Sequence, residues 1–342
     1  MSGYTLITGG AGFIGSNYAA RCLSRGEEVV IFDNLSRRGA DRNIEWLSDQ
    51  FNRKSFNLVK EDIRDAEAIK FAARGADRIV HLAAQVAVTT SVTDPTTDFE
   101  INAGGTFNAL EAARASGRKP AFLYASTNKV YGGMEDVEVV EKNMRFDYKD
   151  LPEGASESQP LDFHSPYGCS KGAGDQYTRD YHRIYGLPTV VLRQSCIYGT
   201  RQFGVEDQGW LAWFIIAAVT GRPITIYGNG KQVRDVLFIE DLLDAYDAAF
   251  ANIKTSAGQI FNIGGGRQNS ISVWSEFGPL LEDLLGKQVK TKRKEWRPGD
   301  QPVFISDIRK AQSLLGWQPK VGVEQGIQRL FNWVKDNLDL FA

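Results

Sequence analysis

The sequence opens with Tyr4-Thr5-Leu6-Ile7-Thr8-Gly9-Gly10-Ala11-Gly12-Phe13-Ile14-Gly15, and this stretch decides the fold. Its first five residues are typical of a short buried strand, and glycines then follow at positions 9, 12 and 15. The first glycine allows a tight turn, the second lets a pyrophosphate approach the backbone, and the third lets a helix pack on the strand. An amphipathic stretch from Ile14 to Leu23 follows. The pattern predicts a dinucleotide bound at a helix N-terminus.

A second apolar strand, residues 28–32, ends at Asp33, 18 residues after Gly15. An acidic side chain at this place accepts hydrogen bonds from the adenosine ribose, although Asp33-Asn34 could instead cap a loop. A 2′-phosphate about 4 Å from the carboxylate would be repelled by roughly 4 kcal/mol at an effective dielectric near 20. Arg37 and Arg38 could offset this repulsion, but exposed ion pairs return only about 0.2–1 kcal/mol each. The sequence therefore favours NAD over NADP.

Length and composition bound the class of protein. A chain of 342 residues exceeds the size at which a single core stops growing, so we expect two subdomains. The net charge of −2 gives no electrostatic reason to expect nucleic acid or an anionic membrane as partner. We expect no secretory signal, because no basic region precedes an apolar stretch at the start, and no apolar run approaches the roughly 18 residues of a membrane span. Three scattered cysteines argue against a disulfide framework or a metal site, and a cytoplasmic protein is predicted.

Strand-like and helix-like segments alternate through the first two hundred residues. Further strands are expected at 56–60, 78–82, 121–125 and 189–193, with helices such as 98–115 and 166–185 between them. This alternation predicts an α/β fold with a doubly wound parallel Rossmann sheet, whose ligands bind beyond the carboxyl ends of the strands.

The pattern becomes irregular from about residue 200. Helices are expected at 208–219 and 239–251, and strands at 224–227, 233–238 and 259–263. We predict an NAD-binding Rossmann domain formed by residues 1–200 plus 232–266. A second, smaller and discontinuous α/β substrate domain is predicted from residues 201–231 plus 267–342.

Tyr167 and Lys171 form a Y-x-x-x-K pair, one turn apart on a single helix face. The preceding Ser165-Pro166 is a good helix start. A tyrosine titrates near pH 10, so a phenolate at pH 7 requires a pKa lowered by about 3, or roughly 4 kcal/mol. We expect Lys171 and a positive nicotinamide ring to favour the anion, and Lys171 to hold the nicotinamide ribose. The alternative is an ordinary solvated helix face.

A polar segment, Ala125 to Gly132, directly follows the fifth expected strand. A hydroxyl group at this place can hydrogen-bond the substrate hydroxyl from whose carbon hydride departs, and steady the developing carbonyl. Thr127 is the candidate and Ser126 the second choice. The alternative is a turn in which these hydroxyls merely end the strand.

Together these residues resemble the extended short-chain dehydrogenase/reductase superfamily, and specifically its nucleotide-sugar epimerase branch. By resemblance Asp62 and Ile63 flank the adenine, and Asn102 supports the backbone of the active site. Arg234 is expected to pair with the substrate diphosphate through its planar fork of donors, the alternative being a structural ion pair. The predicted cofactor-binding residues are Gly9, Gly12, Phe13, Ile14, Gly15, Asp33, Asn34, Asp62, Ile63, Leu82, Ala83, Ala84, Gln85, Asn102, Ala125, Ser126, Tyr167 and Lys171.

Within this branch the resemblance narrows. The segments 127–132, 161–171, 201–203 and 207–210 look like those of the CDP-paratose (CDP-tyvelose) 2-epimerases, which implies a CDP-sugar inverted at C2. Sugar 4,6-dehydratases are similar but carry Thr-Asp-Glu in the active-site segment, where Asp and Glu eliminate water. Here Asn128 and Lys129 follow Thr127, so the acid and base of elimination are absent.

The resemblance also implies the substrate contacts and an assembly. His164 either reaches the substrate or caps the following helix, and Trp210 either contacts the substrate or packs in the core. The predicted substrate-binding residues are Thr127, Asn128, His164, Gln208, Gly209, Trp210, Arg234 and Arg297. An isomerase acting as a homodimer or homotetramer is expected. The alternatives are a UDP- or GDP-sugar 4-epimerase and an inactive NAD-binding regulator, although an intact Thr127, Tyr167 and Lys171 set argues against the latter.

Overall fold

The computed structural model describes residues 3–297 and 300–341, and the chain forms two compact units. Unit 1 comprises Met1–Val130, Ser165–Arg193 and Tyr246–Phe261, and unit 2 comprises Tyr131–His164, Gln194–Ala245 and Asn262–Ala342. These boundaries follow contacts within the chain, whereas the domains predicted above are divided by the ligand that each binds. The division by ligand remains a prediction.

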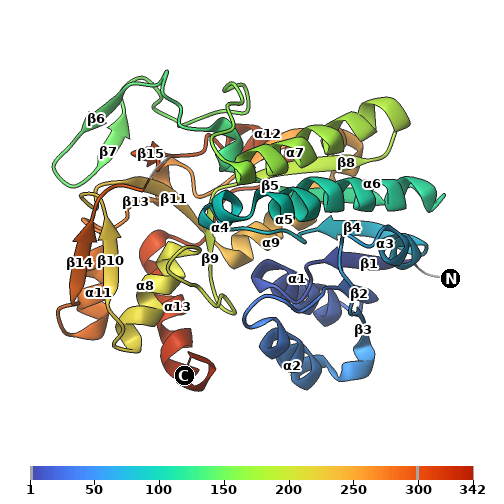
Figure 1. The fold of residues 1–342 in the computed structure, drawn as a ribbon, viewed down its shortest axis with the longest axis horizontal. Coiled ribbons are helices and arrows are strands. Elements are labelled where there is room, and N and C mark those ends of the chain that lie inside the picture. Colours follow the sequence, from blue (N-terminus) through green and yellow to red (C-terminus); the bar gives the residue numbers. More distant parts are fainter. Residues whose placement is uncertain (1–2, 298–299, 342) are drawn as a thin grey trace. The chain divides into compact units, whose positions relative to one another are not determined.

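A seven-stranded sheet has the strand order β12-β8-β5-β4-β1-β2-β3. Most of it belongs to unit 1, and the strands β8, β5, β4, β1, β2 and β3 can be followed in Figure 1. β1 pairs in parallel with β2 and with β4. On one side of β1 the sheet continues through β2 to β3, and on the other it continues through β4, β5 and β8 to β12. The order reverses between β1 and β4, which is where a doubly wound sheet binds its ligand. The predicted fold class is confirmed. The strands are β1 (Tyr4–Thr8), β2 (Val29–Phe32), β3 (Phe56–Val59), β4 (Ala76–His81), β5 (Ala121–Thr127), β8 (Thr189–Gln194) and β12 (Ile260–Ile263).

The inner strands of the sheet are buried because both faces carry helices, whereas the edge strand β3 is partly exposed. Leu6, Ile7, Val80 and Leu123 are fully buried, as expected for continuous apolar runs in a parallel sheet. The helical segments of this unit are α1 (Phe13–Ser24), α2 (Ala40–Phe51), η1 (Arg53–Ser55), α3 (Ala66–Ala73), α4 (Val88–Thr93), α5 (Pro95–Phe99), η2 (Glu100–Gly104), α6 (Gly105–Ala115), α7 (Pro166–Tyr185) and α10 (Ile253–Ser256), while η3 (Asn128–Tyr131) continues β5.

The segment 98–115 is helical throughout, as predicted, but it contains a π-helical turn that the sequence did not predict. α5 ends at Phe99, a π-helical turn follows in η2, and α6 begins at Gly105. π-helical turns often occur at functional sites. The side chain of Asn102 in η2 is held by Asp98 and by the backbone of Gln85, which the local sequence pattern does not reveal.

α7 has the predicted bounds, Pro166–Tyr185. The Ser165 hydroxyl oxygen accepts a hydrogen bond from Gly168 N at 3.0 Å, and Pro166 occupies the first turn. Gly186 ends the helix in the left-handed conformation. The cap is Ser165, so the alternative in which His164 caps this helix is excluded.

Unit 2 contains several small sheets. β11 pairs with β9 and β15 in parallel and with β13 in antiparallel orientation, whereas β10 pairs with β14 and β6 with β7. The strands are β6 (Val139–Glu141), β7 (Phe146–Tyr148), β9 (Cys196–Tyr198), β10 (Ile224–Tyr227), β11 (Val233–Phe238), β13 (Ser270–Ser272), β14 (Thr291–Lys294) and β15 (Val303–Phe304). The helical segments are α8 (Trp210–Val219), η4 (Arg267–Asn269), α11 (Phe277–Leu285), α12 (Arg309–Leu315), α13 (Val323–Asp336) and η5 (Leu338–Phe341).

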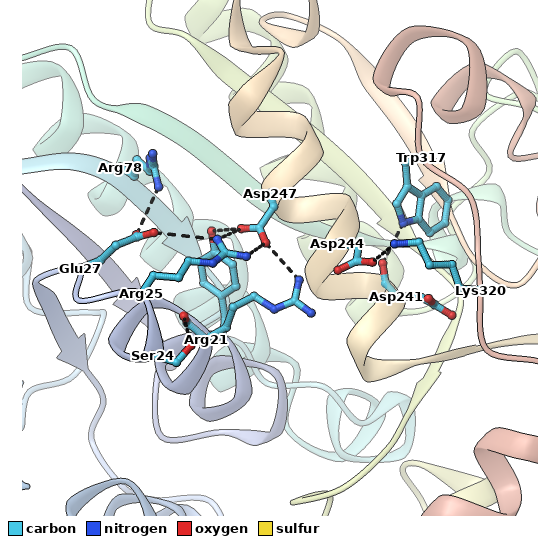
Figure 2. Close-up of polar contacts among 11 residues, drawn as sticks. Arg21, Ser24, Arg25, Glu27, Arg78, Asp241, Asp244, Asp247, Trp317 and Lys320 are labelled. Atoms are coloured by element: carbon cyan, nitrogen blue, oxygen red, sulfur yellow. Dashed lines mark hydrogen bonds and ion pairs between the residues drawn. The ribbon is translucent and has the colours of Figure 1, made fainter. Parts of the chain in front are cut away.

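The chain passes from unit 2 to unit 1 within α9 (Ile239–Ala251). In unit 1, Asp247 accepts hydrogen bonds from Arg21 of α1 and from Arg25, the C-cap of that helix, each at 3.0 Å (Figure 2). In unit 2, the Trp317 indole donates to Asp241 O at 2.8 Å, and Lys320 pairs with Asp244 (Figure 2). Each part of α9 is therefore tied to its own unit. None of the described helices is long and apolar enough to cross a membrane.

Candidate active site

The glycine turn after β1 leaves no room for side chains. Gly9 has a φ of +67°, and a Cβ there would lie 2.7 Å from the backbone nitrogen of Ala83. A Cβ on Gly15 would overlap the carbonyl oxygen of Gly9. Gly12 is the N-cap of α1, where the first N–H groups of a helix point outward without partners in the helix. This arrangement suits a pyrophosphate, as the glycine spacing predicts.

Asp33 closes the same turn from the end of β2. Its carboxylate accepts hydrogen bonds from Ala11 N at 3.0 Å and from Leu35 N at 2.8 Å. Burial raises the pKa of Asp33, while these two hydrogen bonds lower it. The carboxylate is thus positioned as an acceptor beside the glycine turn, where it suits the hydroxyls of an adenosine ribose.

Two further strand ends lie in the same sheet. After β3, the Asp62 carboxylate accepts from Asn34 at 2.9 Å and from the Arg64 guanidinium, which lowers its pKa. After β4, the Thr8 hydroxyl oxygen accepts from Leu82 N at 3.2 Å and from Ala83 N at 3.3 Å. Ile63 is buried. The structure therefore brings the predicted cofactor residues of β1, β3 and β4 to one edge of the sheet.

The π-helical turn supports the segment after β4. Asn102 Oδ1 accepts from Gln85 N at 2.9 Å, and Asn102 Nδ2 donates to Gln85 O at 3.0 Å. The same amide also donates to Asp98 and Ser170, and the Ser170 hydroxyl donates to Asp98. Sequence reasoning assigned Asn102 its supporting place but missed Asp98 and Ser170.

The three predicted catalytic residues all belong to unit 1. Thr127 ends β5, whereas Tyr167 and Lys171 lie in the first two turns of α7, and all three are buried. A hydrogen bond with Thr127 lowers the pKa of Tyr167, which places the two hydroxyls together. The Lys171 ammonium lies 4.3 Å from the centre of the Tyr124 ring.

Burial controls the ionisation of this pair. It raises the pKa of Tyr167 to about 12, against the lowering effects of Thr127 and of the Arg37 charge. It lowers the pKa of Lys171 to about 7, although Asp175 and Asp98 act in the opposite direction. In the protein alone, desolvation disfavours both charged forms. The expectation that Lys171 and a nicotinamide ring together favour the phenolate stays a prediction.

Neighbouring residues of β5 make polar contacts of their own. The Thr127 hydroxyl donates to Asn128 Oδ1 at 3.3 Å and accepts from Lys129 N at 3.2 Å. The Ser126 hydroxyl donates instead to the buried Asp175 carboxylate at 2.7 Å. Thr127 rather than Ser126 is therefore the hydroxyl beside Tyr167, in agreement with the order of preference reached from the sequence.

The remaining predicted substrate residues belong to unit 2. Arg234 is 7% exposed, and its guanidinium pairs with Asp300 Oδ1 at 2.6 Å and donates to Val233 O at 2.7 Å. Arg297 pairs with Asp207 at 3.2 Å and lies 3.9 Å from the centre of the Tyr227 ring. Both guanidinium groups have protein partners. The structural ion pair, which was the alternative interpretation of Arg234, is therefore present in the structure.

Trp210 is the first residue of α8, and Gln208 and Gly209 directly precede it. Gly209 is the N-cap and has a φ of +79°. The Trp210 ring packs edge-on against Phe214 and Phe277, and its buried indole N–H has no hydrogen-bond partner among the described residues. Trp210 thus packs in the core and also retains a free donor.

His164 belongs to unit 2 and is held by a carboxylate. Its Nε2 lies 2.7 Å from Asp162 Oδ2, and its ring packs against Gly132 and Gly133. The structure therefore gives His164 an orienting partner that sequence reasoning did not find. Among the described residues, no group of three or more His, Cys, Asp or Glu side chains could hold a metal ion.

Known proteins are similar to this chain over nearly its whole length. A family profile described as GDP-mannose 4,6 dehydratase matches residues 6–330. The CDP-paratose 2-epimerase of Salmonella typhi is 48% identical over 335 residues, which cover 96% of this chain and 98% of that protein.

Solved structures are similar over the same length. The UDP-glucose 4-epimerase of Thermotoga maritima, solved with UDP-glucose, has a TM-score of 0.83 and 30% identity, covering 98% of this chain and 99% of that one. The UDP-glucose 4-epimerase of Thermus thermophilus, solved with NAD, has a TM-score of 0.81 and 32% identity with the same coverage. The chain belongs to the GDP-mannose 4,6-dehydratase family of extended short-chain dehydrogenases/reductases and is an enzyme of its nucleotide-sugar epimerase branch.

Proposed function

We propose that this protein is an NAD-dependent epimerase that interconverts CDP-paratose and CDP-tyvelose by inversion at C2. The observation that carries the proposal is the 48% identity to a CDP-paratose 2-epimerase over nearly the whole of both chains. The segment after Thr127 agrees, because Asn128 and Lys129 cannot serve as the acid and base of a dehydratase.

Oxidation is needed because C2 of a pyranose is not adjacent to a carbonyl, so its proton is not acidic enough for simple removal. When bound, NAD supplies reversible hydride transfer at that carbon. Tyr167 takes the proton of the C2 hydroxyl and later gives it back. Thr127 donates a hydrogen bond to the same oxygen, and Lys171 as an ammonium favours the phenolate.

The substrate must stay bound while its sugar turns and presents its opposite face. We propose that the Arg234 and Arg297 guanidiniums bind the diphosphate, for which a planar fork of donors is well suited. His164, oriented by Asp162, and the free indole N–H of Trp210 are proposed to contact the sugar or the nucleotide. The assignment of NAD to residues 1–200 plus 232–266, and of the nucleotide sugar to 201–231 plus 267–342, forms part of this proposal.

A panel of CDP-, UDP- and GDP-sugars tests the proposal, with the products identified by NMR. We expect inversion at C2 with the CDP-sugar. Inversion at C4 of a UDP-sugar would instead assign the activity named for the Thermotoga maritima and Thermus thermophilus proteins. Binding of NAD without turnover of any sugar would support a regulator. The proposed homodimer or homotetramer is tested by light scattering of the purified protein.

A further inference from the structure

A buried ion pair lies next to the catalytic helix and was not found from the sequence. Asp175 and Arg193 are 0% and 2% exposed. Arg193 Nε donates to Asp175 Oδ2 at 2.9 Å, and Arg193 Nη2 donates to Asp175 Oδ1 at 3.0 Å. The ion pair is therefore bidentate. Asp175 lies on α7 and Arg193 on β8. The pair therefore joins the catalytic helix to the central sheet.

The same carboxylate also binds the strand that carries Thr127. Ser126, the residue before Thr127 on β5, donates its hydroxyl to Asp175 Oδ2 at 2.7 Å. Gln176 donates to Oδ1 at 2.7 Å. Asp175 thus accepts hydrogen bonds from β5, β8 and α7, and its position is determined from three sides.

Helix geometry places Asp175 in line with the catalytic pair. Tyr167, Lys171 and Asp175 follow one another at intervals of four residues, so they lie along one face of α7. The negative charge of Asp175 acts on Lys171 and raises its pKa, which burial lowers. Among the charged groups that oppose the effect of burial on Lys171, Asp175 has the largest influence.

The other groups around Lys171 do not replace this charge. Tyr124 on β5 and His81 on β4 are fully buried, and burial raises the pKa of the former and lowers that of the latter to about 3, so both are neutral near pH 7. Asp98 on α5 is the second carboxyl group, and its effect on the pKa of Lys171 is smaller than that of Asp175. Burial raises the pKa of Asp98 itself, while its hydrogen bonds with Ser170 and Gln85 lower it. Arg179 on α7 is a further cation near Asp175 and Arg193.

We propose that Asp175, held by Arg193, is a positioning residue whose buried negative charge keeps Lys171 an ammonium beside Tyr167. This inference rests on the reaction proposed above. Arg193 holds the carboxylate in place through two hydrogen bonds. A neutral lysine could neither stabilise a phenolate nor hold an anionic partner. Loss of the Asp175 charge would therefore remove the function of Lys171 without any change to the Lys171 side chain.

Direct titration of Lys171 tests this inference without any substrate. The full-length protein is labelled with ¹³Cε-lysine, and the Lys171 signal is identified as the one missing from Lys171→Met. We expect Asp175→Asn to lower the titration midpoint of Lys171 by about one pH unit. The matched control is Gln176→Ala, which removes a neutral hydrogen bond to the same carboxylate and should leave the midpoint unchanged.

Asp175→Asn takes the carboxylate partner away from the buried Arg193 cation and could unfold the protein. The double variant Asp175→Asn/Arg193→Gln removes both charges, and the same downward shift is expected in it. An unchanged midpoint in either variant, when folded, would show that the pair is only a structural link and would overturn the inference. In the epimerase assay, the alkaline limb of the kcat profile should move to lower pH in the same variants. A parent protein inactive on every CDP-sugar would instead refute the proposed function, because the shift seen by NMR does not depend on turnover.

Discussion

Tyr167 and Lys171 lie one turn apart on α7, and burial shifts their pKa values in opposite directions, to about 12 and about 7. Each shift favours the neutral form of its side chain. The charged pair needed for proton transfer therefore depends on groups around it, among which Arg37 acts on Tyr167 and Asp175 acts on Lys171. These two neighbours are as important to the proposed chemistry as the sequence motif itself.

Replacement of Tyr167 by Phe tests the proposed acid–base group. The ring is kept and the ionisable oxygen is lost, so binding of NAD and CDP should persist while kcat falls by about 10²–10⁴. Steady-state kinetics together with calorimetric titration of CDP measures both effects. A variant within tenfold of the parent would assign the role to another group, of which His164 with its Asp162 partner is the first to test.

Replacement of Lys171 by Met tests the lowered pKa through stability. Between a folded pKa of about 7 and the usual value of 10.5, the unfolded chain binds a proton that the folded protein does not. The stability of the parent should therefore rise with pH across this range, by at most about 1.4 kcal/mol per pH unit from this group. The methionine side chain of the variant cannot ionise. In urea unfolding, the free energy of unfolding of the variant relative to that of the parent should therefore be greatest near pH 6. A difference in free energy of unfolding between variant and parent that is the same at pH 6 and pH 10 would contradict the lowered pKa of Lys171.

Replacement of Asp33 by Ser tests the choice of cofactor. Loss of the carboxylate removes the repulsion of a 2′-phosphate, so the ratio of NAD to NADP affinity should fall by about 10–10³-fold. Fluorescence titration of the protein with each dinucleotide measures this ratio. The control is Asp62→Asn, because the Asp62 carboxylate is already paired with Arg64 and should affect the ratio less. A ratio that does not change in the Asp33 variant would remove Asp33 from the ribose site.

Local patterns predicted the parts of the fold that local chemistry determines. The strand before Gly9, the position of Asp33 and both ends of α7 follow from glycine spacing, strand alternation and the Ser165-Pro166 start. The π-helical turn at Glu100–Gly104 could not be predicted, because Asn102 is held by Gln85 and Asp98 through contacts that only the folded chain makes.

The candidate site was predicted as a set of residue types but not as an electrostatic environment. Asp175 and Arg193 are 18 residues apart, and nothing in their local sequence indicates that they pair across α7 and β8. The upward effect of burial on the pKa of Tyr167 was not predicted either, because it depends on the depth of burial. The four-residue interval from Lys171 to Asp175 was the one signal that could have identified this carboxylate.

The fate of a label at C2 is the most direct test of the proposed reaction. CDP-paratose deuterated at C2 is converted in ordinary water, and the product is recorded by mass spectrometry and NMR. We expect CDP-tyvelose with inverted C2 that still carries the deuterium, because the label leaves and returns as hydride without contact with water. Loss of the deuterium to solvent, or a product inverted at C4 with C2 unchanged, would contradict the account.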